Sequence, residues 1–239
     1  MENTLKSKDE LTQNGFSVIH DIYNKEDITP IITCINEADE SKNTFRKSTE
    51  LFAIRQFLRE IPDVVPLIFN KKLRNVISKI FGKDYFVVKS IYFDKPGTSN
   101  WYVSYHQDLT ISVDKKTNLN GFGPWTVKQN QFAVQPPLAI LQNICTIRIH
   151  LDDTDADNGA LQVIPASHHN IYRPETIHNM QEAVTCAVPQ GGIMIMKPLL
   201  MHSSGRTVNN KNRRVIHIEF SDAELPDPLQ WSERMQIEK

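Results

Sequence analysis

Short β-type runs dominate the chain from Tyr85 onward, and this pattern limits the fold more than any other feature. The runs are rich in β-branched and aromatic residues, and turn sequences such as Asp157-Asn158-Gly159 and Gln190-Gly191-Gly192 separate them. They cover residues 85–93, 109–113, 144–151, 160–164, 183–188, 193–196 and 214–220. Strands this numerous and this short favour a β-sandwich or a β-barrel.

The first part of the chain has a helical pattern instead. Asp27 is expected to cap a helix that runs to Ala38. Apolar residues then recur at helical spacing from Leu51 to Phe81, and Gly82 ends that stretch. We therefore expect helices to support one side of the β-structure.

The length of 239 residues is enough for one sizeable hydrophobic core, so we predict a single domain over residues 1–239. Within it we expect a mainly helical buttress at 1–82 and a β-core at 83–222. Residues 115–137 show little regular pattern and contain Gly121, Gly123 and Pro124, which predicts a lid loop.

Charge and cysteine usage restrict the partners and the compartment. A formal charge of -1 and a pI near 6.7 give no basic surface for nucleic acid or an anionic membrane, so we expect neither partner. The stretch from Met1 to Asn14 is polar and lacks a signal-peptide core. Cys34, Cys145 and Cys186 are widely spaced, which indicates buried free thiols rather than disulfides. We expect a cytoplasmic protein.

One set of residues carries the strongest chemical signal. His106-Gln107-Asp108 is followed at a distance by His202, and Arg213 lies eleven residues beyond that histidine. Two histidines and one carboxylate that leave coordination positions open suit non-haem iron(II) and oxygen chemistry. The planar, permanently charged fork of Arg213 suits the far carboxylate of a dicarboxylic cosubstrate. These residues predict an iron- and 2-oxoglutarate-dependent oxygenase.

The His-x-Asp motif and a close variant occur at more than one place, so the position of each relative to the predicted strands must decide which one binds iron. His150-Leu151-Asp152 has the same spelling, and His217-Ile218-Glu219 is a carboxylate variant. A double-stranded β-helix oxygenase places the triplet near the end of its second core strand and the distal histidine on its seventh, with four strands between them. Enough β-type runs lie between His106 and His202, whereas only three lie between His150 and His202. We therefore prefer His106, Asp108 and His202 as iron ligands and exclude His150.

An ordered set of motifs resembles the phytanoyl-CoA dioxygenase family. The set comprises Tyr92-Phe93-Asp94-Lys95-Pro96, Trp101, His106-Gln107-Asp108-Leu109-Thr110, Arg148-Ile149-His150-Leu151-Asp152-Asp153, Asn158-Gly159-Ala160-Leu161, Ile164-Pro165-Ala166-Ser167-His168, and His202-Ser203-Ser204 through Arg213. The resemblance covers roughly residues 52–220 and is more specific than any single motif. Ala166 departs from it, because the family often has Gly before Ser-His.

The resemblance implies a mainly β fold: a double-stranded β-helix of the jelly-roll or cupin type with supporting N-terminal helices. It implies iron(II) held by His106, Asp108 and His202, with 2-oxoglutarate as cosubstrate and O2 as oxidant. Arg213 would pair with the distal carboxylate of 2-oxoglutarate, and Ser204 would share the strand face of His202 and offer a hydroxyl donor. Lys89, in the first β-type run, would help to hold the anionic cosubstrate.

Residues on the substrate side are less well defined by the sequence. On the run 146–152, alternation puts Arg148 and His150 on one face, which could line the barrel interior. Trp101 lies just before the metal triplet. Trp125 and Lys128 lie in the predicted lid. Packing of the tryptophans in the core and solvation of the lysines explain these residues equally well.

The reaction implied is hydroxylation or a related oxidation of a C–H bond in a small molecule, with release of succinate and CO2. A halogenase is disfavoured because Asp108 occupies the position where halide would have to bind iron. Two alternatives stay open: a non-catalytic cupin-like module that binds a metal or ligand, and an acyl-CoA hydroxylase.

Overall fold

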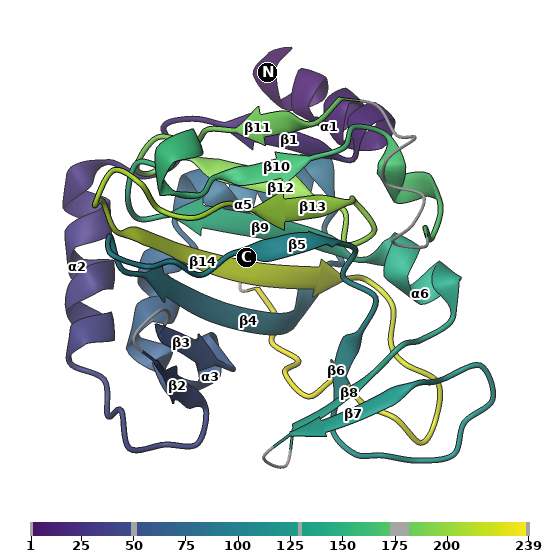
Figure 1. The fold of residues 1–239 in the computed structure, drawn as a ribbon. Coiled ribbons are helices and arrows are strands. Elements are labelled where there is room, and N and C mark those ends of the chain that lie inside the picture. The colour runs from purple at the N-terminus through teal and green to yellow at the C-terminus, as the bar shows by residue number, and fades with distance from the viewer. Residues whose placement is uncertain (1, 49–51, 129–130, 173–181, 238–239) are drawn as a thin grey trace.

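Two antiparallel sheets form the centre of the computed structural model, which describes residues 2–48, 52–128, 131–172 and 182–237 (Figure 1). The seven-stranded sheet has the order β1 (Phe16–Ile19), β12 (Ile193–Met196), β9 (Cys145–His150), β14 (Arg213–Ser221), β4 (Phe86–Lys95), β3 (Phe52–Arg55), β2 (Phe45–Lys47). The four-stranded sheet has the order β11 (Val184–Cys186), β10 (Leu161–Val163), β13 (His202–Ser204), β5 (Val103–His106).

The chain alternates between these sheets in the manner of a double-stranded β-helix. In chain order, β4, β9, β12 and β14 belong to the seven-stranded sheet, while β5, β10, β11 and β13 belong to the four-stranded one. The predicted fold is confirmed. In this order β5 is the second core strand, β13 the seventh and β14 the eighth, so four core strands separate β5 from β13.

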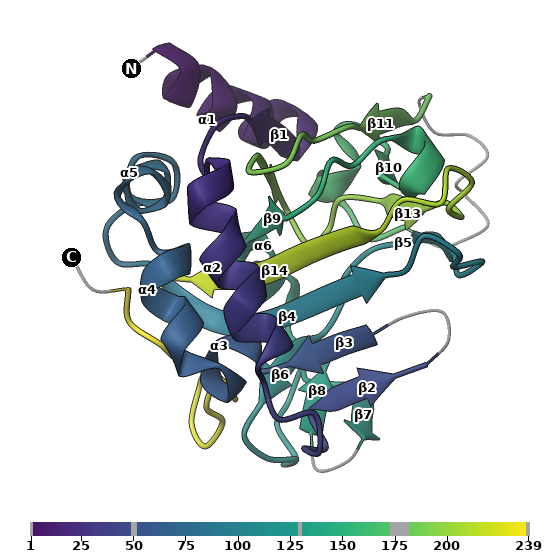
Figure 2. The ribbon, with the colours of Figure 1, turned by 90° about the vertical axis from the view of Figure 1, so that its left-hand side faces the viewer.

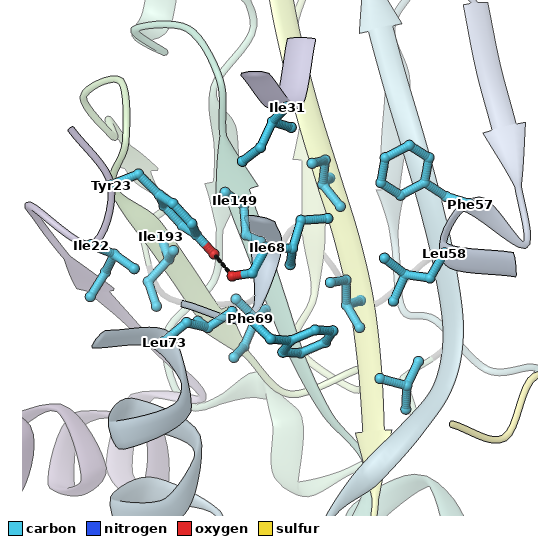
Figure 3. Close-up of a cluster of buried hydrophobic side chains, with 14 of the residues drawn as sticks. Ile22, Tyr23, Ile31, Phe57, Leu58, Ile68, Phe69, Leu73, Ile149 and Ile193 are labelled. Atoms are coloured by element: carbon cyan, nitrogen blue, oxygen red, sulfur yellow. Dashed lines mark hydrogen bonds between the residues drawn. The ribbon is translucent and has the colours of Figure 1, made fainter. Parts of the chain in front are cut away.

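Helices cover the seven-stranded sheet on the side away from the four-stranded one (Figure 2). These helices are α1 (Glu2–Asn14), α2 (Lys25–Asn36), α3 (Phe57–Glu60), α4 (Val65–Ile68) and α5 (Lys71–Ile80), with a short 3-10 turn at Pro62–Val64. Elsewhere the chain forms α6 (Leu138–Asn143), which packs in a second apolar cluster, and 3-10 turns at Ala156–Asn158 and Ser167–His169. The main apolar core lies between the covering helices and the sheet, where Ile31, Ile68 and Leu73 meet Ile149 and Ile193 (Figure 3).

Tyr23 brings a polar atom into this core and satisfies it. Its hydroxyl donates a hydrogen bond of 2.6 Å to the carbonyl of Ile68, at the end of α4 (Figure 3). A buried hydroxyl without such a partner would destabilise the fold.

Strand alternation sorts side chains between the helix side and the barrel interior. On β9, Ile147 and Ile149 join the apolar core under the helices. Arg148 therefore points to the opposite side, where it lines a cavity. All six residues of β9 are buried, because the strand is covered on both faces. The interior face predicted for Arg148 and His150 is the one that Arg148 occupies, and a substrate role for either residue stays a prediction.

The N-terminal region contains strands that its sequence did not predict. Besides its helices it supplies β1, β2 and β3, so the helical prediction for 51–81 was wrong at its beginning. Pairing of β3 with the edge of β4 outweighs local helical spacing there. The cap of α2 was also misplaced: Asn24 is the N-cap, and Asp27 completes the capping box three residues later.

Residues 115–137 are more regular than expected. They include β7 (Trp125–Lys128) and β8 (Gln131–Val134), which form a three-stranded sheet with β6 (Ile111–Val113). The strand pattern was weak because Gly and Pro cluster before it and the strands are short. A lid function for this sheet stays a prediction.

Two further predictions concern the cysteines and the membrane. Cys145 and Cys186 are buried and Cys34 partly so, and all three are free thiols. In the described ranges, the structure contains no helix with the length and apolar character to cross a bilayer.

Candidate metal centre

His106 and His202 face each other on β5 and β13, two neighbouring strands of the four-stranded sheet. They are direct register partners of β5 and β13, and their ring centroids lie 4.3 Å apart. Asp108 follows β5 and approaches both: its carboxylate oxygens lie 3.8 Å from Nε2 of His106 and 3.9 Å from Nε2 of His202. One ligand atom from each of the three residues lies within 4.8 Å of the others. The chain thus brings together all three predicted ligands.

The two rings are oriented by their own strands. Nδ1 of His106 lies 2.8 Å from the carbonyl of Ser104, and Nδ1 of His202 lies 2.8 Å from the carbonyl of Leu200. A carbonyl only accepts, so each Nδ1 carries the proton and each Nε2 keeps its lone pair. Both lone pairs are therefore available to a metal ion beside Asp108.

The protonation states also suit a cation site. Burial lowers the pKa of His202 to about 4, although Asp108 partly opposes this, so the imidazole is neutral at pH 7. Burial works against the charged form of Asp108, but Lys89 and His202, which is protonated at the low pH where Asp108 titrates, outweigh it and lower the pKa of Asp108 to about 2. Neutral imidazole and ionised carboxylate are the states in which these groups bind metals.

Gln107, between the two ligands of the triplet, is hydrogen-bonded to the backbone of two other segments of the chain. Its side-chain amide donates to the carbonyls of Leu199 and Asn170, and its carbonyl oxygen accepts from the backbone N–H of Tyr172. These bonds join the end of β5 to the segment before β13 and to the loop after β10.

A small cavity of about 150 Å³ opens beside the three ligands. We call it the small cavity; it is lined by Lys89, Ile91, Phe93, Trp101, Val103, His106, Asp108, Arg148, Leu161, His202, Ser203, Ser204, Arg213 and His217. Its volume corresponds to roughly five water molecules at about 30 Å³ each. Its lining includes most of the residues that the sequence nominated.

Two buried guanidinium groups line the small cavity. Arg148 and Arg213 are 8% and 5% exposed, and the Nε–H of each has no hydrogen-bond partner among the described residues. Burial lowers the pKa of Arg148 to about 10. Burial and the nearby Arg148 lower that of Arg213 to about 9, so both stay protonated at pH 7. Buried cations with unused donors favour an anionic ligand.

His150 lies near these arginines but is not part of the cavity wall. Its Nδ1 lies 2.7 Å from Oγ1 of Thr154, while its buried Nε2 has no partner in the described part of the chain. Burial, together with Arg148 and Arg213, lowers its pKa well below the ordinary value. His150 is therefore neutral and sits apart from the three grouped ligand atoms.

Ser204 uses its hydroxyl within the protein. The hydroxyl donates a 3.0 Å bond to the carbonyl of Gly159, the same oxygen to which Arg213 donates. Gly159 has a φ of 82° and approaches Gly205 so closely that a β-carbon would meet its carbonyl at 2.6 Å. The turn between β9 and β10 thus positions both predicted cosubstrate residues, and Ser204 has no second proton to offer a ligand.

Lys89 belongs to a buried chain of polar groups that the sequence analysis did not foresee. Its ammonium pairs with Glu219 at 2.7 Å, Glu219 lies 3.1 Å from Nε2 of His217, and Nδ1 of His217 lies 3.1 Å from Arg148. Arginine only donates, so Nδ1 of His217 accepts and Nε2 carries the proton. Asp108, His217 and Glu219 are also close enough to hold a metal ion. The occupied nitrogens of His217 disfavour that alternative.

The remaining nominated residues fall in different places. Trp101 lines the small cavity. Trp125, on β7, packs instead against a second apolar cluster that includes Val113 and Trp231. The side chain of Lys128 lies outside the described part of the structure.

A second and larger cavity, of about 590 Å³, adjoins the first, and Lys89 and Ile91 line both. We call it the large cavity. Its wall also includes Arg55, Arg59 and Glu233. Glu233 is 6% exposed, and its carboxylate accepts hydrogen bonds from the backbone N–H and the hydroxyl of Ser90.

Glu233 is expected to make the stability of the fold depend on pH. Burial raises its pKa from 4.5 to about 7, against the effect of the Ser90 hydrogen bonds. Protonated Glu233 therefore favours the folded state fully when the pH is below its pKa in the unfolded chain. This stabilisation, at most about 3 kcal/mol of the free energy of unfolding, is lost as the pH rises through the pKa in the folded protein. Glu233→Gln should remove this dependence. Urea unfolding of both proteins at about pH 5 and about pH 8 measures it, and parallel pH profiles would contradict the assignment.

Comparisons with known proteins agree with the geometry. Residues 11–215 match the family model described as phytanoyl-CoA dioxygenase. Uncharacterized protein Rv1501 of Mycobacterium tuberculosis is 29% identical over 108 residues, which is 43% of this chain and 40% of that protein. The same figures hold for Uncharacterized protein Mb1539 of Mycobacterium bovis. The match thus spans less than half of either relative.

Solved structures share the fold at low sequence identity. EctD from S. alaskensis with bound Fe has a TM-score of 0.71 and 17% identity, over 93% of this chain and 79% of that one. SnoK, a non-heme alpha-ketoglutarate-dependent carbocyclase from nogalamycin biosynthesis, has a TM-score of 0.70 and 14% identity, over 92% of this chain and 84% of that one.

Proposed function

The chain belongs to the phytanoyl-CoA dioxygenase family, and from this premise we propose that it is an iron(II)- and 2-oxoglutarate-dependent dioxygenase whose metal is held by His106, Asp108 and His202. One observation carries the proposal. Two unprotonated Nε2 atoms and an ionised carboxylate converge beside a cavity that two buried guanidinium groups also line. That donor set suits ferrous iron, and that cavity suits an anionic cosubstrate.

The residues divide the work between metal and cosubstrate. His106, Asp108 and His202 would supply three ligands and leave three positions of an octahedral ion for other groups. Arg213 would pair with the distal carboxylate of 2-oxoglutarate through its free donors, and Arg148 would add a second positive charge. Lys89 would contribute less than predicted, because Glu219 already neutralises it.

When bound, iron(II) with 2-oxoglutarate and O2 supplies the oxidation of an unactivated C–H bond, with release of succinate and CO2. The protein would keep Arg148 in place through His217 and Glu219, whose hydrogen bonds fix the guanidinium beside the cavity. Burial of these groups excludes water and strengthens their interaction with an anion.

Metal and cosubstrate binding can be measured before any substrate is known. Isothermal titration of the metal-free protein should give one equivalent of iron(II) under anaerobic conditions, followed by one equivalent of 2-oxoglutarate. Succinate release during a metabolite screen with iron(II) and ascorbate would then establish turnover. Stoichiometric binding without succinate formation for any metabolite would favour the non-catalytic cupin-like module.

We expect a small polar or anionic substrate rather than a long acyl-CoA thioester. The chain has a formal charge of -1, Glu219 already neutralises Lys89, and Arg148 lies in the wall of the small cavity beside the candidate metal ligands. The large cavity is left with Arg55 and Arg59, which suit one anionic group of a small substrate better than the several phosphates of coenzyme A. Succinate assays should respond to free acids and amino-acid-like compounds. Product formation confined to acyl-CoA thioesters would overturn this expectation in favour of an acyl-CoA hydroxylase.

A further inference from the structure

The large cavity has a volume that suits a small organic molecule. Its volume of about 590 Å³ falls within the range of roughly 300–1,000 Å³ that is usual for ligand sites. Its shared wall with the small cavity, formed by Lys89 and Ile91, places it next to the candidate metal ligands. Thr110, two residues after Asp108, also lines it.

Arg55 points into this cavity for a reason that follows from strand register. On β3, Ile54 packs into the apolar core under the helices, so the adjacent Arg55 faces the barrel side of the sheet. Its register partner on β4 is Ile91, which lines both cavities. The guanidinium is half-buried, and burial lowers its pKa.

None of the residues that the structure describes neutralises the charge of Arg55. In residues 2–48, 52–128, 131–172 and 182–237, its side chain has no hydrogen-bond or ion-pair partner. Its charged neighbours Arg46 and Lys89 are also basic. The two acidic residues of the wall are engaged elsewhere: Glu233 with Ser90, and Asp114 with the backbone of Gln230.

We infer that the large cavity binds the organic substrate and that Arg55 holds an anionic group of that substrate, either a carboxylate or a phosphate. The inference rests on the proposed function, because a molecule in the large cavity is a substrate only if iron bound at the neighbouring site oxidises it. Arg59, which is exposed and lines the same cavity, would add positive charge at its mouth. The rest of the molecule would extend along Ile91 toward the metal ligands.

Two anion sites with different occupants follow from this arrangement. Arg213 and Arg148 line the small cavity and would hold the cosubstrate, whereas Arg55 lines only the large one. Saturation with 2-oxoglutarate would therefore leave the Arg55 site free. This separation makes the inference testable with simple probes.

The test uses the full chain loaded with nickel(II), which replaces iron and prevents turnover, and with saturating 2-oxoglutarate. Hexanoate, hexyl phosphate and hexanamide are then titrated calorimetrically. We expect binding of hexanoate, hexyl phosphate or both, and much weaker binding of the uncharged hexanamide. The comparison of the two anions distinguishes a carboxylate site from a phosphate site.

Arg55→Gln should weaken binding of the preferred anion by roughly tenfold to a hundredfold, as expected for a charge-assisted hydrogen-bonded pair. The affinity for 2-oxoglutarate should stay the same, which also shows that the variant is folded. Arg46→Gln is the matched control, because Arg46 lies on the same sheet in β2 but does not line the cavity. It should bind both 2-oxoglutarate and the probe as the unmodified protein does.

The outcomes separate the two proposals. Failure of the unmodified protein to bind 2-oxoglutarate would contradict the proposed function itself. Normal 2-oxoglutarate binding without anion binding, or with equal anion affinity in Arg55→Gln, would overturn only the role of Arg55.

Discussion

Alanine in place of His106, Asp108 or His202 is expected to abolish turnover and to prevent stoichiometric iron binding. Each change removes one of three protein ligand atoms that lie within 4.8 Å of one another. Loss of an outer partner of a metal ligand already costs about tenfold to a hundredfold in affinity, so loss of a ligand should cost more. Anaerobic iron(II) titration and succinate release measure the two effects.

His150→Ala is the control for these variants. His150 shares the His-x-Asp spelling but lies outside the grouped ligand atoms, so this variant should retain one equivalent of iron. Activity within a few-fold of the unmodified protein in any of the three ligand variants, at stoichiometric iron, would refute the metal site. Loss of iron from His150→Ala would point to the wrong triplet.

Arg213→Ala is expected to weaken 2-oxoglutarate binding by about 1.5–3 kcal/mol, on the order of tenfold to a hundredfold, while iron binding stays intact. The guanidinium is buried against the small cavity and its Nε–H is unused in the described residues, so a donor is left for the carboxylate of the cosubstrate. Titration of 2-oxoglutarate into the iron-loaded variant measures the loss.

Arg214→Ala provides the matched comparison on the same strand. Arg214 pairs with Asp152 at 2.6 Å on the opposite face of β14, as period-two alternation predicted. Its removal should affect stability modestly and the 2-oxoglutarate requirement little. A larger rise in that requirement for Arg214→Ala than for Arg213→Ala would contradict the placement of Arg213 in the site.

The β-rich part of the chain was readable because its strands alternate between two distinct environments. Residues 193–196 were predicted with the bounds of β12, and the other buried runs were placed to within a few residues. The run at 109–113 is the exception, since β6 belongs to the small three-stranded sheet rather than to the barrel. The count of strands between His106 and His202 nevertheless led to the correct placement on β5 and β13.

The strands that were missed are short, and long-range pairing decides them. β2, β3 and β13 have three or four residues each, too few for a periodic pattern to stand out. β3 exists because it pairs with β4, and that pairing is invisible to any local window of sequence. Arg55 was lost with it, since a helical assignment gave its side chain no reason to face the barrel.

Part of the polar network was available from the sequence and part was not. His217 and Glu219 follow Arg213 at even spacing on one strand, so alternation alone places them on the cosubstrate face. Their partners come from elsewhere: Lys89 from β4 and Arg148 from β9. Only the strand order shows that these charges meet.

Gln107 has a consequence for how such sites are recognised in sequences. A motif search accepts any residue at the middle position of His-x-Asp. In this protein the side chain at that position joins the end of β5 to the segment before β13 and to the loop after β10. A substitution there would leave every ligand present while altering the spacing between them. The residue between the two ligands can therefore distinguish chains that assemble the metal site from chains that only match the His-x-Asp motif.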